Sequence, residues 1–311
     1  MILVAGSANL DFVVRADHIP SPGETVLGRD FKTFPGGKGA NQAVACARAG
    51  GAATHMLLAL GQDAFARPLE DSLQGAGVKL LAQRPVDQPT GTAFICVASS
   101  GENAITVAPG ANATLRPEHL PPLGGYTHLL LQLETPLDTV TAYAQAARAA
   151  KVQVVLNAAP AQVLPQALLT AVDVLVVNEG ELALVSQCDG SVAECLDKLQ
   201  VPTVVVTLGA HGCVARHEGN TFLQASYKVQ PVDTTGAGDT FCGSLAAALS
   251  HGHALPSALQ YASAAAALAC TRLGAQSSIP EAAEVAHLLR DQPDVNSPER
   301  LAALRTLCGI S

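Results

Sequence analysis

Residues 233–239, with the sequence Asp-Thr-Thr-Gly-Ala-Gly-Asp, are the segment whose chemistry the sequence indicates most directly. A strand-like run at 227–232 precedes the segment, and an Ala-rich helix is expected to follow it at 237–250. Glycines let backbone N–H groups approach a ligand closely, and a helix N-terminus carries partial positive charge. This turn therefore predicts an anion hole suited to a transferring phosphoryl group.

Asp239 is the carboxylate at the first turn of that predicted helix. From there it can accept a proton from a hydroxyl that lies beside the anion hole. The competing interpretation is an acid that only caps the helix, which is common at helix starts. A Gly-x-Gly-Asp turn between a strand and an Ala-rich helix is more specific than a lone acid, and it lacks the spacing of a dinucleotide-binding fingerprint. We therefore expect transfer of a phosphoryl group to a hydroxyl, with Asp239 as the base.

Three further segments combine glycines or acids with the ends of predicted elements. Gly36-Gly37-Lys38-Gly39-Ala40-Asn41 opens a helix and could hydrogen-bond a polyol, although it is not a P-loop. Asn178-Glu179-Gly180-Glu181 follows a strand at 172–177, where α/β folds bind ligands, and could hold a hydrated magnesium ion. Residues 207–212 form a Gly-rich turn after a strand at 204–206. Taken singly, each segment is equally consistent with an ordinary helix entry or turn.

The elements that must position these segments alternate between strand and helix. Short apolar strands separated by helices indicate a mostly parallel sheet that is covered on both faces. Two segments, 9–35 and 90–107, instead resemble hairpins that could pair as a small separate sheet. The strands expected in the second half are 128–133, 152–157, 172–177, 204–208, 212–216 and 221–225, and the helices are 137–150, 164–170, 180–187, 237–250 and 257–272, with a surface helix after Pro293.

Composition excludes several classes of protein. The 311 residues carry a net charge of −8, so a general nucleic-acid-binding protein, which needs a basic face, is not expected. Apolar stretches are far shorter than the roughly 18 residues of a membrane span, and the N-terminus lacks the basic region of a signal peptide. The eight cysteines include no Cys-x-x-Cys pair, which favours reduced, buried thiols over a disulfide or zinc framework. We expect a cytoplasmic protein with no nucleic-acid or membrane partner.

These segments in this order, with Asn9-Leu10-Asp11 at the start, resemble the ribokinase family of carbohydrate kinases. The resemblance extends to about Pro280, and its two strongest motifs are residues 36–41 and 233–239. It implies one ribokinase-like α/β domain over 1–311, with a central, mostly parallel sheet flanked by helices and a small β-sheet lid formed by roughly 9–35 and 88–108. Such lids often form the contact of a homodimer, so a homodimer through the lid is expected.

The resemblance also implies roles for individual residues. Asp239 matches the general base, and Gly236, Ala237 and Gly238 match the anion hole. The sugar hydroxyls would be held by Asn9, Asp11, Gly37, Lys38, Asn41 and Glu134, together with Asp239. ATP would contact Asn178, Thr207, Leu208, Gly209, Ala210, His211, Gly212 and Gly238, and Glu181 would hold Mg²⁺ through water. A loop that binds K⁺ would contain Asp233, Thr235, Ala269, Arg272, Gly274 and Ser278, several of them through backbone carbonyls.

Two residues depart from the family's pattern. Val177 precedes Asn178 where the family often has Pro, which affects local stiffness. Ser263 stands where a His often lies near the adenine, so the adenine contact is assigned to Ser263 only by position.

The activity implied by the resemblance is ATP-dependent phosphorylation of D-ribose at O5. Kinases for deoxyribose, fructose or a nucleoside such as adenosine are the alternatives, followed by an inactive sugar or nucleotide sensor, against which an intact Asp239 argues.

Overall fold

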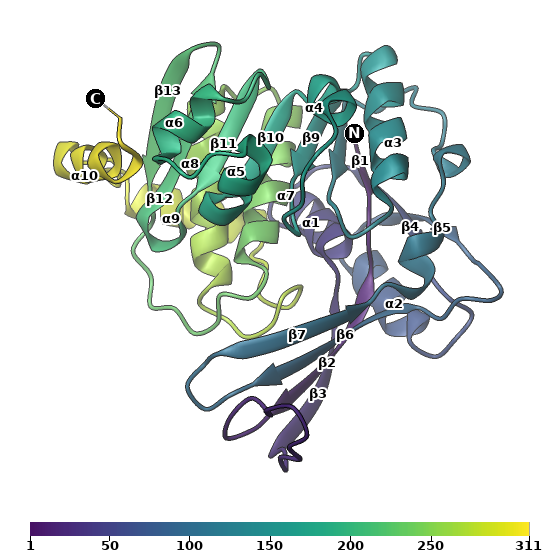
Figure 1. Cartoon of the computed structure of the whole chain (residues 1–311). Coiled ribbons are helices and arrows are strands. Elements are labelled where there is room, and N and C mark those ends of the chain that lie inside the picture. The colour runs from purple at the N-terminus through teal and green to yellow at the C-terminus, as the bar shows by residue number, and fades with distance from the viewer. Residues whose placement is uncertain (311) are drawn as a thin grey trace.

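The computed structural model describes residues 1–310, and its central feature is a nine-stranded sheet (Figure 1). Its strand order is β13-β12-β11-β10-β9-β8-β1-β4-β5. The seven strands from β11 to β5 are parallel, and β12 and β13 extend the edge as an antiparallel meander. The bounds are β1 Ile2–Ala5, β4 Thr54–Ala59, β5 Lys79–Gln83, β8 His128–Leu131, β9 Gln153–Asn157, β10 Val174–Asn178, β11 Thr203–Thr207, β12 Gly212–His217 and β13 Asn220–Ala225. The predicted α/β class with a mostly parallel sheet is confirmed.

Helices cover both faces of this sheet (Figure 1). One layer contains α1, α2, α7, α8 and α9, and the other contains α3, α4, α5 and α6. The bounds are α1 Lys38–Ala47, α2 Ala66–Gly75, α3 Leu137–Ala149, α4 Gln166–Ala171, α5 Glu179–Ser186, α6 Val192–Asp197, α7 Ala237–Ser250, α8 Leu255–Ala269, α9 Ala282–Asp291 and α10 Pro298–Cys308. Between residues 1 and 310 there is no helix that is both long and apolar enough to span a bilayer.

The hydrophobic core lies between the sheet and these two helix layers. Strands that are buried on both faces are continuous apolar runs, which is why they could be predicted from the sequence. β8 is fully buried because Leu129, Leu130 and Leu131 face helices on both sides. One expectation needs correction, because residues 227–232 form no strand but a connection without regular secondary structure. The surface helix expected after Pro293 is α10, which packs against β12 and β13 through buried Leu304 and Cys308 and is otherwise largely exposed.

A second sheet projects from the body as a separate unit (Figure 1). Its strand order is β3-β2-β6-β7, with bounds β2 Asn9–Arg15, β3 Asp30–Gly36, β6 Gly91–Val97 and β7 Asn103–Ala108. The two hairpin-like segments predicted from the sequence therefore do pair with each other. At the end nearest the body, Asn9 pairs with Gly36 on one side and with Gly91 on the other. We call Asn9, Gly36 and Gly91 the junction row.

Candidate active site

The site lies at the carboxyl ends of the parallel strands, beside the point between β1 and β8 where the strand order reverses. Crevices outside the carboxyl ends of parallel strands at such a reversal are where open α/β sheets bind ligands. Glu134, Asn157, Asn178 and Thr207 all follow or end strands at this edge. A cavity of about 160 Å³ opens there, lined by Lys38, Asn157, Ala159, Val176, Val177, Asn178, Glu181, Thr207, Gly236, Gly238, Asp239 and Cys242. Residues from both strongest sequence motifs therefore meet in one place.

Asp239 lies in the first turn of α7, and only 8% of it is exposed. Oδ2 of Asp239 accepts a hydrogen bond from Nδ2 of Asn41 at 2.9 Å, and Oδ1 of Asp239 accepts one from Nε2 of Gln42 at 2.9 Å. The nearby negative charge of Asp239 is the main reason that the pKa of Lys38 is raised, with Glu134 and Glu181 adding to the effect against desolvation. The ammonium of Lys38 is thus held charged beside an ordered carboxylate.

The N-terminus of α7 supplies backbone donors beside Asp239. Gly236 has φ 74°, a left-handed conformation that favours glycine, and a Cβ at this position would lie 3.0 Å from Cα of Ala275. Ala237 donates its N–H to the carbonyl of Thr234 at 3.2 Å. Across residues 1–310, the amides of Gly236, Gly238 and Asp239 have no such partner, as is usual at a helix start. Gly238 is also open, because a Cβ there would meet nothing within 4 Å. Two glycine amides and that of Asp239 can therefore face an anion.

The other predicted sugar-binding residues lie close to Asp239, where the small sheet joins the body, although only Lys38 and Asp239 of this set line the cavity. Burial, with the charges of Glu134 and Asp239, raises the pKa of Asp11 to about 7. Glu134 Oε2 accepts hydrogen bonds from Ser7 Oγ at 2.5 Å and from the backbone N–H of Lys38 at 2.9 Å. Oδ1 of Asn41 is buried and has no partner within residues 1–310, so it remains available to accept from a hydroxyl.

Asn9 and Gly37 complete this side of the site. The side-chain oxygen of Asn9 accepts a hydrogen bond from Nδ2 of buried Asn112 at 2.8 Å, and Asn112 also accepts from the backbone N–H of Ala8 at 3.0 Å. Gly37 has φ 88°, and a Cβ there would lie 2.7 Å from the backbone nitrogen of Asn9. Only glycine fits at this point, because it allows the start of α1 to pass directly beside the start of β2.

The predicted nucleotide contacts lie after β10 and β11. Asn178 and Glu181 form a reciprocal cap: the N–H of Asn178 donates to Glu181 Oε2, and the N–H of Glu181 donates to Asn178 Oδ1, both at 2.8 Å. Burial raises the pKa of Glu181, against the hydrogen bond from Asn178 and the charge of Lys38. Thr207 ends β11, and a short 3-10 turn, Gly209–His211, follows before Gly212. Ser263 is buried on α8, with its Oγ 3.8 Å from Sγ of Cys213.

The predicted cation loop is a separate cluster beside the start of α7. Asp233 Oδ1 accepts from Thr235 N at 2.9 Å and Thr235 Oγ1 at 2.7 Å, and its Oδ2 accepts from Gly274 N at 2.9 Å. Although burial acts to raise it, these hydrogen bonds hold the pKa of Asp233 below its ordinary value. Ser278 is buried and donates to the carbonyl of Ala275. Arg272 pairs with Glu284, and Ala269 ends α8.

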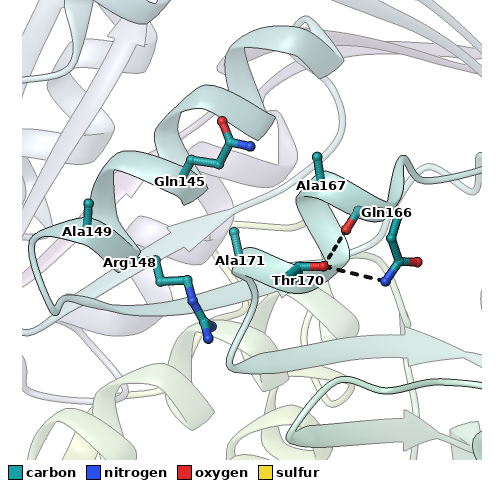
Figure 2. A pocket seen from close by; sticks show the side chains of 7 residues that line it. All are labelled: Gln145, Arg148, Ala149, Gln166, Ala167, Thr170 and Ala171. Atoms are coloured by element: carbon teal, nitrogen blue, oxygen red, sulfur yellow. Dashed lines mark hydrogen bonds between the residues drawn. The ribbon is translucent and has the colours of Figure 1, made fainter.

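A larger groove lies elsewhere and contains none of these residues. Figure 2 shows it between α3 and α4, with a volume of about 470 Å³. It is lined by Gln145, Arg148, Ala149, Gln166, Ala167, Thr170 and Ala171. Its side chains are mostly alanine methyls and flexible amides, and the layer that carries it is opposite α7 (Figure 1). The convergence of charged groups at Asp239 makes the smaller cavity the candidate site.

Sequence reasoning missed several residues that support this site. Gln42, Gln132 and Asn157 are buried polar side chains beneath Asp239, Ser7 holds Glu134, and Asn112 holds Asn9. Gln42 directly follows the predicted Gly-Lys-Gly-Ala-Asn motif, and Asn157 ends a predicted strand, so both had a positional signal. Gln132 and Asn112 had none, because each meets its partner only through the tertiary fold.

The comparisons with known proteins agree with this geometry. Residues 1–282 match the pattern that defines the pfkB family carbohydrate kinases. A ribokinase of Haemophilus influenzae is 37% identical over 300 residues, covering 93% of this chain and 98% of its own. A crystal structure of a Thermotoga maritima ribokinase superposes with a TM-score of 0.85 at 36% identity, covering 93% of this chain and 99% of the other. An Arabidopsis thaliana ribokinase complexed with ribose and ATP gives 0.84 at 33%, covering 93% and 98%. The chain belongs to the pfkB family of carbohydrate kinases.

Proposed function

We propose that this carbohydrate kinase transfers the γ-phosphoryl group of ATP to O5 of D-ribose, giving D-ribose 5-phosphate. One observation carries the proposal: the carboxylate of Asp239 lies in the first turn of α7, beside backbone amides that have no partner within residues 1–310, and it also accepts a hydrogen bond from Asn41 and helps to raise the pKa of Asp11. A proton acceptor is therefore near both an anion site and hydrogen-bonding groups suited to a polyol. The relatives of similar sequence and length are ribokinases, which favours ribose among the possible sugars.

In this proposal the sugar is held by side chains that converge from both sheets. Asp11 and Glu134 accept hydrogen bonds from sugar hydroxyls, Lys38 and Asn9 donate, and Asn41 offers the unpaired Oδ1. Gly37 lets the backbone approach the ring. Such groups fix the attacking hydroxyl near the proton acceptor, and positioning is the larger part of catalysis in phosphoryl transfer.

Asp239 then accepts the proton of the attacking hydroxyl as that oxygen bonds to the γ-phosphorus. A positioned general base contributes roughly 10²–10⁴-fold to the rate. The amides of Gly236, Ala237 and Gly238 stabilise the charge that develops on the phosphoryl oxygens, as preorganised donors do at helix N-termini. For the amide of Ala237 to take part, its hydrogen bond to Thr234 must give way. ATP is held by Asn178 and by residues 207–212, with Ser263 near its adenine ring.

Two ions fit the donor groups of the site. Mg²⁺ keeps several waters and takes one or two carboxylates plus substrate phosphates, which suits Glu181, whose Oε1 accepts no hydrogen bond within residues 1–310. K⁺ prefers oxygen ligands, and the loop offers the carboxylate of Asp233, the buried hydroxyl of Ser278 and backbone carbonyls. When bound, the two ions would neutralise phosphate charge and order the loop beside the anion hole.

We further propose that the small sheet acts as a lid and as the contact of a homodimer. Phe94 is 53% exposed and Ile105 is 56% exposed, and they point to opposite faces of the sheet because they lie one residue out of register on paired strands. Exposed large apolar side chains concentrated on one small sheet favour a protein contact. Because the phosphoryl donor is ATP, we expect the enzyme to act in the cytoplasm.

The proposal is tested by measuring ATP consumption with a panel of acceptors. The panel contains D-ribose, 2-deoxyribose, fructose and adenosine, each with and without enzyme. We expect the highest kcat/KM with ribose, and a ribose 5-phosphate product by mass spectrometry and NMR. A higher value with another acceptor would reassign the substrate within the family. Absence of acceptor-dependent ATP consumption would reject a kinase and favour a sensor.

A further inference from the structure

A chain of buried amide side chains runs beneath Asp239 and links four elements. Gln132, after β8, donates from Nε2 to Oε1 of Gln42 at 2.7 Å. Gln42, on α1, donates from Nε2 both to Asp239 Oδ1 and to Asn157 Oδ1, each at 2.9 Å. Asn157, at the end of β9, donates from Nδ2 to the carbonyl of Val176 at 3.2 Å. Gln42 is 0% exposed and Gln132 is 1% exposed, so water does not compete for these bonds.

The orientation of the Gln42 and Gln132 amides follows from the negative charge of Asp239. A carboxylate only accepts hydrogen bonds, so Gln42 must direct its NH₂ group toward Asp239. That orientation leaves Oε1 of Gln42 as an acceptor, which Gln132 satisfies with its own NH₂ group. A flipped Gln42 would place two oxygens against each other at Asp239 and two NH₂ groups against each other at Gln132. The chain therefore has one orientation, and it fixes the Oδ1 edge of Asp239.

The two helices that carry Gln42 and Asp239 approach closely enough to make this contact rigid. Gly243 lies one turn after Asp239, and a Cβ there would lie 2.5 Å from the carbonyl oxygen of Gln42 and 2.6 Å from Cβ of Ala45. Packing at this distance is possible only with a glycine, and it leaves α1 and α7 little freedom to slide. The distance from Gln42 to Asp239 is consequently set by helix packing and not by a flexible loop.

From this arrangement we infer that Gln42 is a positioning residue for the phosphoryl-transfer reaction. By holding Oδ1 of Asp239, it directs the other oxygen, Oδ2, toward the cavity, where Asn41 is its only partner within residues 1–310. The acceptor hydroxyl then approaches Oδ2 and can replace or share the hydrogen bond from Asn41. Gln42 is fully buried and is not among the residues that line the cavity, so we assign its effect to the chemical step and not to binding. The inference rests on the proposed function, because it assigns Asp239 as the base.

The test replaces Gln42 by methionine, which keeps the volume and removes the donor. We expect kcat with ribose to fall roughly 10- to 100-fold, the range reached when a reacting group is misplaced by about 1 Å. The dissociation constants of ribose and ATP, measured by calorimetry, should stay at the wild-type values. The matched control is Gln224→Met, a buried glutamine on β13 bonded to Asn296 and Ala225, for which kcat should stay unchanged.

A double-mutant cycle separates positioning from general loss of structure. In an Asp239→Asn background, Gln42→Met should cause no further loss of the residual kcat, because the group through which it acts is gone. An equal loss in both backgrounds would overturn the inference. So would wild-type kcat in Gln42→Met, or weaker ribose and ATP binding that accounts for the whole loss.

Gln132→Met provides a second route if Gln42→Met does not fold. It removes only the donor that supports Gln42, so we expect a smaller fall in kcat in the same direction, again with unchanged binding. Wild-type kcat in a folded Gln132→Met together with an unfolded Gln42→Met would assign the chain to stability alone. Absence of acceptor-dependent turnover in the wild type would instead refute the proposed function, so the two failures are distinct.

Discussion

Asp11 is buried beside two other acids, so its ionisation should lower the stability of the protein while it favours sugar binding. Replacing Asp11 by asparagine should remove both effects. Burial, Glu134 and Asp239 raise its pKa from 3.8 to about 7 in the folded protein. A carboxyl whose pKa is raised on folding binds its proton more tightly in the folded state than in the unfolded state. The wild-type protein therefore loses stability as pH rises between those two values, and this loss is complete above about pH 7.

The magnitude follows from the size of that interval. Each pKa unit corresponds to about 1.4 kcal/mol, so the raised pKa of Asp11 lowers the stability of the sugar-free protein, relative to its value at low pH, by about 2 kcal/mol at pH 5 and by about 4 kcal/mol at pH 8. The neutral amide of the Asp11→Asn variant would carry no charge at either pH. The stability of this variant relative to the wild type should therefore rise by about 2 to 3 kcal/mol from pH 5 to pH 8.

The assay is urea unfolding of both proteins, without sugar, at the two pH values. Asp63→Asn is the matched control. Although burial acts to raise it, the pKa of Asp63 is lowered by hydrogen bonds that include the N–H of Thr90 at 2.7 Å, so its carboxylate is ionised at both pH values. This control should lose stability by the same amount at pH 5 and pH 8. A relative stability of Asp11→Asn that does not change with pH would refute the reasoning.

Sugar affinity should change in the opposite direction. If ionised Asp11 accepts hydrogen bonds from ribose, the wild-type KM for ribose falls as pH rises from 6 to 8, by about 10-fold for a group with a pKa near 7. Asp11→Asn should show a higher KM with a flat profile over that range. A wild-type KM that is constant from pH 6 to 8 would mean that the ionised form of Asp11 is not the one that binds the sugar.

Three further outcomes are expected. Asp239→Asn should lower kcat by roughly 10²–10⁴-fold and leave ATP binding by calorimetry unchanged, and near-normal kcat would reject Asp239 as the base. Potassium chloride should activate more than sodium chloride at equal ionic strength, since the loop at Asp233 offers oxygen ligands beside the anion hole, and equal rates would remove the potassium assignment. Phe94→Asp or Ile105→Asp should convert a dimer to a monomer in sedimentation velocity, and an unchanged sedimentation coefficient for both would exclude the lid as the contact.

The sequence predicted the sheet and its flanking helices because their signals are local. The buried strands are continuous apolar runs such as Leu129–Leu131, and the helix after residues 233–239 follows a glycine turn. The failure at residues 227–232 has a physical cause as well. These residues alternate like a strand but belong to neither sheet, and the surface helix expected after Pro293 is present as α10.

For the site, sequence predicted residues by type and order but not the groups that orient them. Asn41 and Asp239, separated by 198 positions in the chain, were expected in one site from their motifs, and they do form a hydrogen bond. Gln132 and Asn112 were missed because a buried amide has no sequence signature of its own. The raised pKa of Asp11 was equally inaccessible, since it arises from three acids brought together by different elements.

The junction row places the small sheet where it can influence which sugar is bound. A Cβ on Gly36 would lie 2.1 Å from Oδ2 of Asp11, and one on Gly91 would lie 2.4 Å from Oδ1 of Asn9. The small sheet thus joins the body at residues proposed to hold the sugar, whereas Asp239 lies on a helix of the body. Sugar preference can accordingly diverge among descendants of this enzyme through changes in the small sheet alone, and the apparatus for phosphoryl transfer can be inherited intact.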